Sequence, residues 1–374
     1  MTFITLVITL FYVAIIGSFV FGFDKVAEFQ LKDIPAKTKF TIIIPFRNEA
    51  EHLPFLLNSI IGLNYPRDSF EIIFVDDASS DNSAKLIEGF QKKSGIDSKL
   101  IDNIRLSNAP KKDAISTAIK IAKYDWIVTT DADCILPKYW LDTYDCFIQG
   151  HDAKYIVAPV TYNSVNTFLD RFQLLDFLSL QGTTIGSFGI KKPFLCNGAN
   201  LAYKASLFKS VNGFDGNTNI ASGDDIFLLE KAIKLIPKEV HYLKNLHASV
   251  TTLPEPNLKS LISQRKRWAS KTSKYSNLFG KLTGIFVLFM NALMICLLMI
   301  TMAGIVQPKV LIYTFIVKFG LDFLLLFKTL RFFNQEQFLM SYIFSSLIYP
   351  FFSVFVAFAS IFKGYEWKGR KFKT

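Results

Sequence analysis

Cysteine is scarce in this sequence, and the 374-residue chain has only four. These cysteines, Cys134, Cys146, Cys196 and Cys296, lie far apart and match no spacing typical of a zinc or redox site. A disulfide framework is therefore disfavoured as the basis of the fold, and a reducing compartment is favoured. We interpret the thiols as buried apolar groups.

The sequence also lacks two kinds of phosphate-binding loop. Neither a Gly-x-Gly-x-x-Gly fingerprint nor a Walker sequence is present, so carboxylates and a metal ion would have to hold any pyrophosphate. Nor does a nucleic-acid-binding motif accompany the formal net charge of +11. The basic residues lie beside apolar segments, where anionic lipid would attract them, and we expect no nucleic-acid partner.

Apolar residues, by contrast, are abundant. They make up 51% of the chain, aromatic residues make up 15%, and the mean hydropathy is +0.29. This composition excludes disorder and indicates contact with lipid. The apolar run from Thr2 to Phe23 has about the 20 residues that cross a bilayer, and its charges come afterwards, so we expect a retained anchor. Three more apolar segments close the chain, at 283–305, 309–327 and 338–362.

Basic residues beside these segments predict the orientation of the chain, because they favour the cytoplasmic side of a membrane. Several flank the large middle region, which is therefore predicted to be cytoplasmic: Lys25, Lys32, Lys37, Lys39, Lys271, Lys274 and Lys281. Others lie in the tail: Lys363, Lys368, Arg370, Lys371 and Lys373. The tail is therefore also predicted to be cytoplasmic. Three full spans after a cytoplasmic middle region would instead place the tail on the opposite side of the membrane.

The segment 309–327 bears on this conflict, because it carries Lys318 and Asp322 four residues apart on one helical face. Ionisable groups in lipid are costly unless they are paired or face protein. Either this segment is re-entrant or interfacial, or it spans the membrane with a salt-bridged pair inside a bundle and an exported tail. The sequence leaves both arrangements open.

The middle region alternates between apolar β-branched runs and helical patterns. The runs predict strands at Phe40 to Pro45, Glu71 to Val75, Ile104 to Leu106 and Trp126 to Thr130. Helical patterns separate them, the last from about Lys112 to Ala122. This alternation predicts an α/β fold with a doubly wound, mostly parallel sheet and helices on both faces. Ligands bind beyond the carboxyl ends of the strands in such sheets.

Acidic pairs follow two of the predicted strands. Asp76 and Asp77 come after the second strand, and Asp131 and Asp133 come after the last. Two carboxylates separated by one residue at a strand end can hold a hard divalent cation, which neutralises a diphosphate. A turn or helix cap made of acidic residues is the plainer interpretation of either pair alone.

Two other polar clusters are candidates to bind a polyhydroxyl ligand or to accept the proton of an attacking hydroxyl. The stretch from Cys196 to Tyr203 is a small polar turn followed by helix-like sequence, and such a turn lets amide groups approach a polyhydroxyl ligand. Asp224 and Asp225 precede an apolar helix start, where an acid is either an N-cap or a proton acceptor for an attacking hydroxyl.

Basic residues at two places would suit a phosphate. Lys111 and Lys112 begin a predicted helix, as phosphate ligands or as ordinary surface lysines. Gln264-Arg265-Lys266-Arg267-Trp268 precedes the first C-terminal apolar segment. It is either a juxtamembrane helix with a tryptophan anchor or a motif in which Arg267 binds diphosphate and Trp268 a sugar face.

Taken in order, these clusters resemble the motifs of the family-2 glycosyltransferases. The matching strings are Ile44-Pro45-Phe46-Arg47-Asn48-Glu49, Val75-Asp76-Asp77-Ala78-Ser79-Ser80-Asp81, Asp131-Ala132-Asp133, Asn197-Gly198-Ala199-Asn200, Gly223-Asp224-Asp225 and Gln264-x-x-Arg267-Trp268. The sequence looks most similar to the membrane-embedded branch that includes cellulose, chitin and hyaluronan synthases and ceramide glucosyltransferases. The resemblance covers about Phe40 to Trp268 and implies a GT-A-type fold.

The resemblance also implies roles for individual residues. One set would bind the nucleotide sugar: Pro45, Arg47, Glu49, Asp76, Asp77, Lys111 and Asp131. Asp133, with Asp131, would bind Mg²⁺ or Mn²⁺ through the diphosphate. A second set would face the acceptor: Gly198, Ala199 and Asn200. A third would clamp the diphosphate and acceptor: Gln264, Arg267 and Trp268. Asp225 would be the catalytic base, and Asp224 stands where the family usually has glutamate.

We therefore predict an inverting, membrane-bound glycosyltransferase that uses a nucleotide-diphosphate sugar and a lipid or growing glycan acceptor at the cytoplasmic face. The membrane would be the cell inner or plasma membrane if the protein is bacterial. The expected organisation is an anchor at 1–23, a basic linker at 24–39, a GT-A domain at 40–255, a juxtamembrane segment at 256–280, a membrane region at 281–362 and a basic tail at 363–374. A non-catalytic nucleotide-sugar-binding subunit is the alternative. A transporter is disfavoured because the spans are few and show no inverted repeat. The donor, the acceptor and the oligomeric state stay open.

Overall fold

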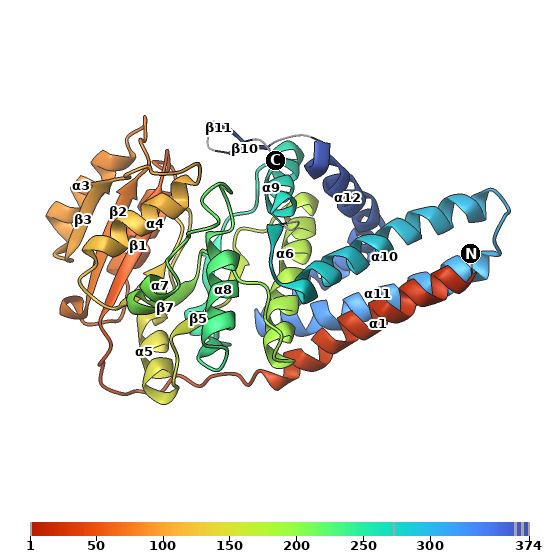
Figure 1. Ribbon diagram of the computed structural model, residues 1–374, viewed down its shortest axis with the longest axis horizontal. Helices are drawn as coiled ribbons and strands as arrows, with labels where there is room; N and C mark the ends of the chain where they lie inside the picture. The colour runs from red at the N-terminus through yellow and green to blue at the C-terminus, as the bar shows by residue number, and fades with distance from the viewer. Residues whose placement is uncertain (1, 272–273, 363–364, 368–369, 373–374) are drawn as a thin grey trace. The chain divides into compact units, whose positions relative to one another are not determined.

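The computed structural model describes residues 2–271, 274–362, 365–367 and 370–372 (Figure 1). Lys363, Lys368 and Lys373 of the predicted basic tail lie outside the described residues. Contacts divide the chain into two compact units. We call one the membrane unit, formed by Met1–Val26, Ser164–Leu195 and Pro254–Thr374, and the other the sheet unit, formed by Ala27–Asn163 and Cys196–Leu253.

The sheet unit is built on a seven-stranded sheet in the order β3-β2-β1-β4-β7-β5-β8. Its strands are β1 (Phe40–Phe46), β2 (Phe70–Asp76), β3 (Ser98–Asp102), β4 (Trp126–Thr129), β5 (Tyr155–Val157), β7 (Leu201–Lys204) and β8 (Val240–Tyr242). β3, β2, β1 and β4 run parallel to one another, and β7 is antiparallel to both β4 and β5. This arrangement confirms the mostly parallel sheet predicted from the sequence.

Helices and a second small sheet complete the sheet unit. The helices are α2 (Leu53–Ile61), η1 (Arg67–Ser69), α3 (Ser83–Ser94), α4 (Pro110–Ile121), α5 (Trp140–Gly150), α7 (Ala205–Ser210), α8 (Asp224–Leu235) and η2 (Leu246–Ala248). The small sheet pairs β6 (Val160–Tyr162) with β9 (Val250–Thr252) in parallel.

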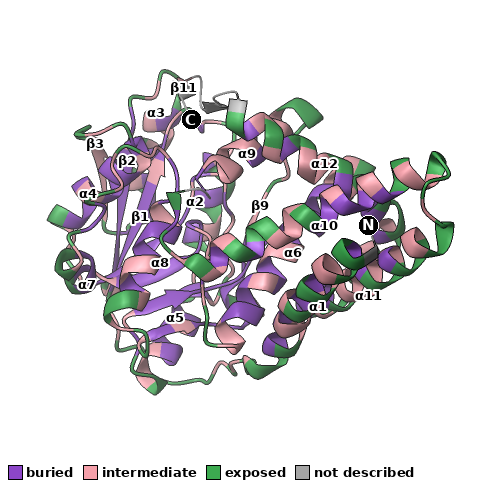
Figure 2. Cartoon of the chain, turned by 45° about the vertical axis from the view of Figure 1, so that its right-hand side comes forward, coloured by how far each residue is buried: buried purple, intermediate pink, exposed green. Residues whose placement is uncertain are grey.

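The core of the sheet unit is the central strand pair. Phe40, Ile42, Ile43 and Ile44 of β1 are fully buried, and Figure 2 shows β1 coloured as buried along most of its length. Burying each such side chain contributes about 1.5–3 kcal/mol, which explains why an apolar β-branched run becomes a central strand.

Two local predictions were wrong. The third strand lies at Ser98–Asp102, whereas Ile104 and Leu106 of the predicted strand are 56% and 74% exposed. The sequence after the 196–200 turn forms strand β7 instead of a helix, because Leu201–Lys204 pairs with both β4 and β5. In both cases long-range pairing overrode a weak local pattern.

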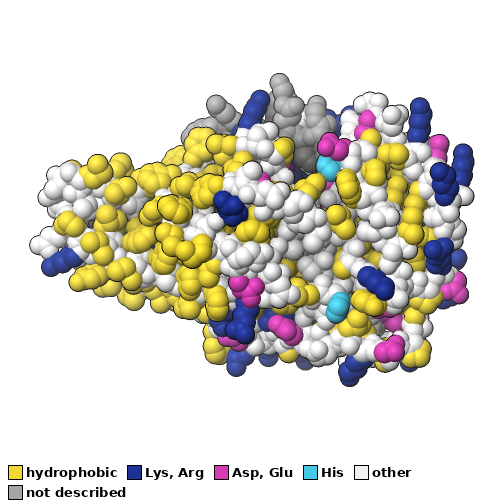
Figure 3. All heavy atoms as spheres, turned by 180° about the vertical axis from the view of Figure 1, so that it is seen from behind, with side chains coloured by type: hydrophobic (Ala, Val, Ile, Leu, Met, Phe, Trp, Pro, Cys, Tyr) yellow, Lys and Arg dark blue, Asp and Glu magenta, His cyan; other side chains and the backbone are white. Residues whose placement is uncertain are grey.

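The membrane unit is helical. It contains α1 (Thr2–Lys25), α6 (Phe168–Gly189), α9 (Leu258–Ser270), α10 (Leu278–Met302), α11 (Pro308–Phe332), η4 (Glu336–Ser341), α12 (Tyr342–Phe362) and the short pair β10 (Tyr365–Trp367) and β11 (Arg370–Phe372). Among the described residues, four helices are long and apolar enough to cross a membrane: Phe3–Lys25, Leu278–Met302, Pro308–Phe332 and Glu336–Ile361. Figure 3 shows hydrophobic side chains gathered over these helices.

The third of these helices carries the two charges discussed above. α11 is continuous, and Lys318 Nζ lies 2.6 Å from Asp322 Oδ2. Tyr12 of α1 donates a hydrogen bond of 2.5 Å to Asp322 Oδ1. The structure therefore has the salt-bridged pair inside a helix bundle, whereas the side of the membrane on which the tail lies stays a prediction.

Glycines bring two helices of this unit into close contact. A Cβ added at Gly186 of α6 would lie 2.5 Å from the backbone oxygen of Phe19, and one added at Gly189 would lie 1.8 Å from the backbone oxygen of Gly22. Small residues permit this approach of α1 to α6, in the way that small residues do between membrane helices.

Candidate active site

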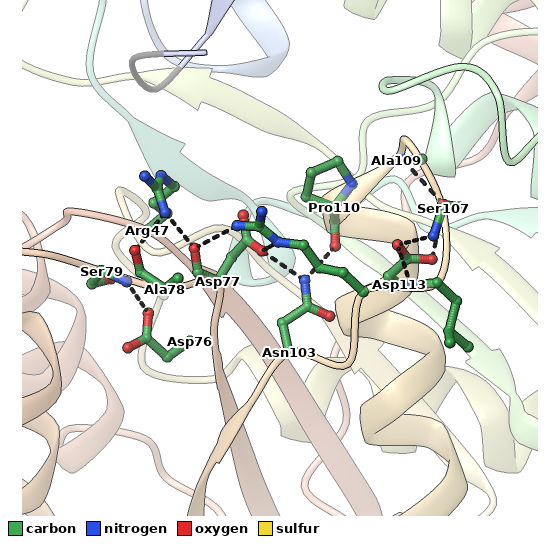
Figure 4. Close-up of polar contacts among 12 residues, drawn as sticks. Arg47, Asp76, Asp77, Ala78, Ser79, Asn103, Ser107, Ala109, Pro110 and Asp113 are labelled. Carbon is green, nitrogen blue, oxygen red and sulfur yellow. Dashed lines mark hydrogen bonds and ion pairs between the residues drawn. The ribbon is translucent and has the colours of Figure 1, made fainter.

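The loop after β2 forms the first part of the site (Figure 4). The register of β1 and β2 pairs Phe46 with Asp76, so Arg47 and Asp77 follow at the same edge of the sheet. Arg47 Nη1 donates to the backbone oxygens of Asp77, at 2.6 Å, and Ala78. Ala78 adopts a φ of 59°, a left-handed conformation that is costly for a residue other than glycine. Arg47 thus helps to hold a strained loop.

The carboxylate of Asp77 is fixed by two side chains that the sequence analysis did not identify. Arg105 Nε lies 2.6 Å from Asp77 Oδ1, and Asn103 Nδ2 donates to the same oxygen at 2.8 Å. Asp76 is engaged locally, because its Oδ1 accepts from the backbone nitrogen of Ser79 at 2.8 Å. The two acids of this pair therefore differ: Asp76 shapes the loop, and Asp77 is oriented by charged and amide donors.

Glu49 and Pro45 support the same edge of the sheet. Pro45 lies within β1, and Glu49 is 6% exposed. Glu49 Oε2 contacts His52 Nδ1 at 2.8 Å, and the Glu49 backbone nitrogen donates to Ser83 Oγ at 2.8 Å. These contacts join the loop after β1 to the start of α3.

A lysine at the start of α4 joins two acidic clusters. Lys111 Nζ lies 2.6 Å from Asp131 Oδ1 and 3.3 Å from Asp224 Oδ2. The three side chains come from different segments, after β3, after β4 and at the start of α8. The structure thus brings together residues that the sequence spreads over more than a hundred positions.

This cluster changes the proton affinities of its members. Burial alone would lower the pKa of Lys111, but the carboxylates of Asp131 and Asp224 raise it above the usual value for lysine, so the ammonium stays charged at neutral pH. Burial raises the pKa of Asp131; Lys111 opposes this rise and Asp133 adds to it. The charge on Asp131 therefore depends on the nearby ammonium.

The turn before β7 lies against the same cluster. A Cβ added at Gly198 would lie 3.0 Å from Asp224 Oδ2, 3.2 Å from Lys111 Nζ and 3.5 Å from Asp225 Cβ. The Gly198 backbone nitrogen donates to Asp225 Oδ2 at 3.2 Å, and the Asp225 Oδ1 atom accepts from the backbone of Ile226 at 2.8 Å. The antiparallel pairing of β7 with β4 positions this turn beside the carboxyl end of β4.

The other two residues of that turn are buried in the sheet unit. Ala199 is 4% exposed and Asn200 is fully buried. Asn200 Oδ1 accepts from Trp140 Nε1 at 2.9 Å and from the Tyr144 hydroxyl at 2.8 Å. Asn200 Nδ2 donates to the backbone oxygens of Pro159 and Ala248, both at 2.7 Å. Asn200, expected from the motif to face an acceptor, here cross-links the core.

Part of the sheet unit matches a known protein family. Residues 41–211 match the model of glycosyl transferase family 2. The chain carries a family-2 glycosyltransferase domain. A poly-β-1,6-N-acetyl-D-glucosamine synthase of Staphylococcus epidermidis is 25% identical over 355 residues, which cover 87% of this chain and 80% of that one. A synthase of the same name from Staphylococcus aureus is 29% identical over 181 residues, covering 45% of this chain and 41% of that one.

A solved structure agrees with the fold of this glycosyltransferase. The mannosyltransferase PcManGT of Pyrobaculum calidifontis, solved with GDP-Man and Mn²⁺, aligns with a TM-score of 0.55 at 16% sequence identity. The alignment covers 92% of this chain and 98% of that one. This likeness supports the GT-A-like fold of the sheet. The family match and the synthase relatives support a nucleotide-sugar glycosyltransferase, and four of the described helices are long and apolar enough to cross a membrane.

The protein side chains of the site supply only part of the ligands that a divalent ion needs. Among the described residues, no group of three or more His, Cys, Asp or Glu side chains is arranged to hold a metal. Asp131 and Asp133 offer oxygen ligands of the kind that Mg²⁺ and Mn²⁺ prefer, and a diphosphate and water would supply the remainder. These two residues would hold the ion, which would neutralise charge on a diphosphate.

The thiol next to this pair, Cys134, is buried. Burial, then the charges of Asp133 and Asp131, raise the pKa of Cys134 well above the usual value for a thiol. Cys134 and Cys146 are buried, Cys196 and Cys296 are half-buried, and no two of the four form a disulfide with each other.

The Gln264-x-x-Arg267-Trp268 motif of the glycosyltransferase lies on α9 in the membrane unit. Gln264 Nε2 donates to Glu255 Oε1 at 2.8 Å, and the guanidinium of Arg265 lies 4.1 Å from the Trp268 ring. Arg265 Nε also pairs with Asp176 at 2.6 Å. Arg265 Nη1 donates to Gln264 Oε1. Gln264 and Trp268 therefore help to hold Arg265, a residue within the motif to which the sequence assigned no role. The roles of Arg267 and Trp268 toward a ligand stay predictions.

Proposed function

We propose that this glycosyltransferase transfers a sugar, with inversion at the anomeric carbon, from a nucleoside-diphosphate sugar to a hydroxyl of a growing glycan or a lipid. The observation that carries the proposal is the meeting of Lys111, Asp131, Asp224 and Asp225 at the Gly198 turn. An ammonium suits a diphosphate, and a carboxylate suits an attacking hydroxyl, so the two halves of the reaction have adjacent partners.

The nucleotide would bind along the edge formed by the loops after β1 and β2. Asp77 is held by Arg105 and Asn103, so its carboxylate has a fixed orientation, in which it would accept a hydrogen bond from the nucleoside. When the donor binds, the ammonium of Lys111 would shift its pairing in part from Asp131 to the diphosphate. Asp131 and Asp133 would then take the divalent ion.

Asp225 is the proposed base. In the reaction it accepts the proton of the acceptor hydroxyl while the hydroxyl oxygen forms a bond to the anomeric carbon and the bond from that carbon to phosphate oxygen breaks. The electron pair of the broken bond leaves with the nucleoside diphosphate, whose charge Lys111 stabilises. General-base assistance of this kind is worth about 10²–10⁴-fold in rate.

The donor and acceptor classes rest on the relatives. Their name, poly-β-1,6-N-acetyl-D-glucosamine synthase, supports an N-acetylhexosamine nucleotide as the first donor to test and a growing glycan as the first acceptor. A lipid acceptor is the second. The basic residues that flank the sheet unit support a cytoplasmic location for the site.

The test uses the full chain in nanodiscs, Mn²⁺ or Mg²⁺, and a panel of labelled UDP and GDP sugars. Label is measured separately in lipid extract and in polymer retained on a filter, which distinguishes the two acceptors. Asp225→Asn should abolish transfer while nucleotide-sugar binding, measured by calorimetry, stays within about twofold. Asp152→Asn, at an exposed aspartate, is the matched control and should transfer at the wild-type rate.

Two results would reject parts of the proposal. Transfer by Asp225→Asn at the wild-type rate would reassign the base, with Asp224 next. Binding of nucleotide sugars by the wild-type chain with no transfer of any of them would favour a non-catalytic binding subunit.

A further inference from the structure

The loop that leads to the acidic pair, residues 211–223, has an unusual backbone. Asn212, Gly213, Gly216 and Gly223 all have a positive φ, of 54°, 49°, 84° and 83°. No strand lies in this loop, so its carbonyl groups are not paired in a ladder. It ends at Gly223, directly before the first turn of α8, which carries Asp224 and Asp225.

Two lysines bind this loop through its carbonyl oxygens. Lys112 Nζ donates to the backbone oxygens of Asn217 and Ile220, at 2.8 and 2.9 Å. Lys231 Nζ donates to those of Val211, Gly213 and Asp215, at 3.1, 2.7 and 2.9 Å. Lys231 thus holds the first half of the loop and Lys112 the half that leads to the acids.

Lys112 is the more deeply buried of the two. It is only 1% exposed, and its ammonium lies 4.7 Å from the ring centroid of Phe227 and 6.0 Å from that of Phe214. Burying an ammonium is costly unless hydrogen bonds and aromatic faces compensate for the lost water. The contacts of Lys112 supply both kinds of compensation, which marks the position as one built to hold a charge.

The place of Lys112 in α4 links it to the reacting groups. Lys111 and Lys112 are neighbours in the first turn of α4, so their side chains point about 100° apart around the helix. The dipole of a helix disfavours cations at this end, and contacts elsewhere must offset that effect. Lys111 contacts Asp224 directly, and Lys112 holds the loop that ends at Gly223, the residue before Asp224. One helical turn thus fixes the acidic pair at its carboxylate and at its backbone.

We propose that Lys112 is a positioning residue: it fixes the loop 211–223 and so sets where Asp224 and Asp225 lie relative to the acceptor. The inference rests on the proposed function of that acidic pair. Lys112 touches no reacting atom, so its removal should slow transfer without weakening the binding of the donor, whose proposed nucleoside partner Asp77 follows β2 and is held by Arg105 and Asn103 instead of by Lys112.

The experiment compares four variants of the full chain in nanodiscs: Lys112→Met, Lys112→Arg, Lys231→Met and, as control, Lys120→Met at an exposed position of the same helix. For each we measure kcat and KM with UDP-GlcNAc and with GDP-mannose, and amide hydrogen exchange across residues 211–223. Lys112→Met should lower kcat 10- to 100-fold, leave the donor KM within about twofold, and speed exchange at residues 214–222.

The other variants separate positioning from simple stability. Lys112→Arg should recover part of kcat, because a guanidinium keeps the charge and can still donate to the loop carbonyls. Lys231→Met should speed exchange mainly at residues 211–216 and lower kcat less. Lys120→Met should match the wild type. If Lys112→Met does not accumulate, Lys112→Gln supplies a neutral donor for the same measurement.

Faster exchange in the loop of Lys112→Met with an unchanged kcat would overturn the inference. So would a fall in kcat matched by an equal loss of folded protein. Failure of the proposed function looks different, since the wild type would then transfer no sugar from either donor.

Discussion

Replacing Asn200 by alanine should unfold the sheet unit at a much lower temperature instead of altering acceptor recognition. The substitution leaves the Trp140 Nε1 and Tyr144 hydroxyl donors, both in fully buried side chains, without the oxygen they now bind. It also removes the amide that donates to the Pro159 and Ala248 carbonyls. An unsatisfied buried group costs about 1–3 kcal/mol, so we expect a loss of about 3–5 kcal/mol after partial relaxation.

For a unit of this size, each kcal/mol lowers Tm by about 2–4 °C, which predicts a fall of about 6–20 °C. Thermal unfolding is followed by tryptophan fluorescence in nanodiscs at one scan rate, because membrane proteins often unfold irreversibly. Asn58→Ala, at an exposed position of α2, is the matched control and should change Tm by less than about 2 °C.

Activity measurements distinguish the two roles of Asn200. A core role predicts that Asn200→Ala loses transfer only in proportion to the unfolded fraction, with an unchanged acceptor KM. An unaltered Tm together with a raised acceptor KM would refute the reasoning and restore the role that the sequence motif suggests.

Two predictions concern the membrane unit. Gly186→Ala should lower the free energy of unfolding by about 1–3 kcal/mol, because its Cβ would lie 2.5 Å from the Phe19 backbone oxygen. Gly17→Ala is the control and should be neutral, because a Cβ added there has nothing within 4 Å. Equal melting temperatures of the two variants would contradict this account. Lys318→Met should cost about 3–5 kcal/mol by leaving Asp322 without its ammonium partner. Adding Asp322→Asn should recover more than half of the lost thermal stability, and no recovery would show that the charge pair is not the cause.

The sheet was predictable where burial and local pattern agree. The apolar runs of β1, β2 and β4 are buried on both faces, so composition alone identifies them within a residue or two. β3 was misplaced because its own sequence, Ser98–Asp102, is only half-buried and mostly polar. β7 was read as a helix start, since pairing with β4 and β5 is invisible to a local pattern.

The site was predictable at its acids and much less so at their partners. Asp77, Asp131 and Asp225 stand in motifs, but Arg105 lies between two exposed apolar residues of a wrongly predicted strand. The sequence did contain a signal for Lys112. Two lysines at the positive end of a helix dipole are unfavourable unless other contacts compensate for them. No sequence pattern, however, could show that one faces carboxylates and the other loop carbonyls.

The division of the chain has a practical consequence for biochemistry. The polypeptide passes between the two units at four points, near residues 26, 163, 195 and 253. A water-soluble fragment spanning 27–253 would still include α6, whose glycines approach Phe19 of α1 and Thr329 of α11. Without those neighbours, this helix would expose a hydrophobic surface that promotes aggregation. A usable soluble version would need residues 164–195 exchanged for a short polar bridge.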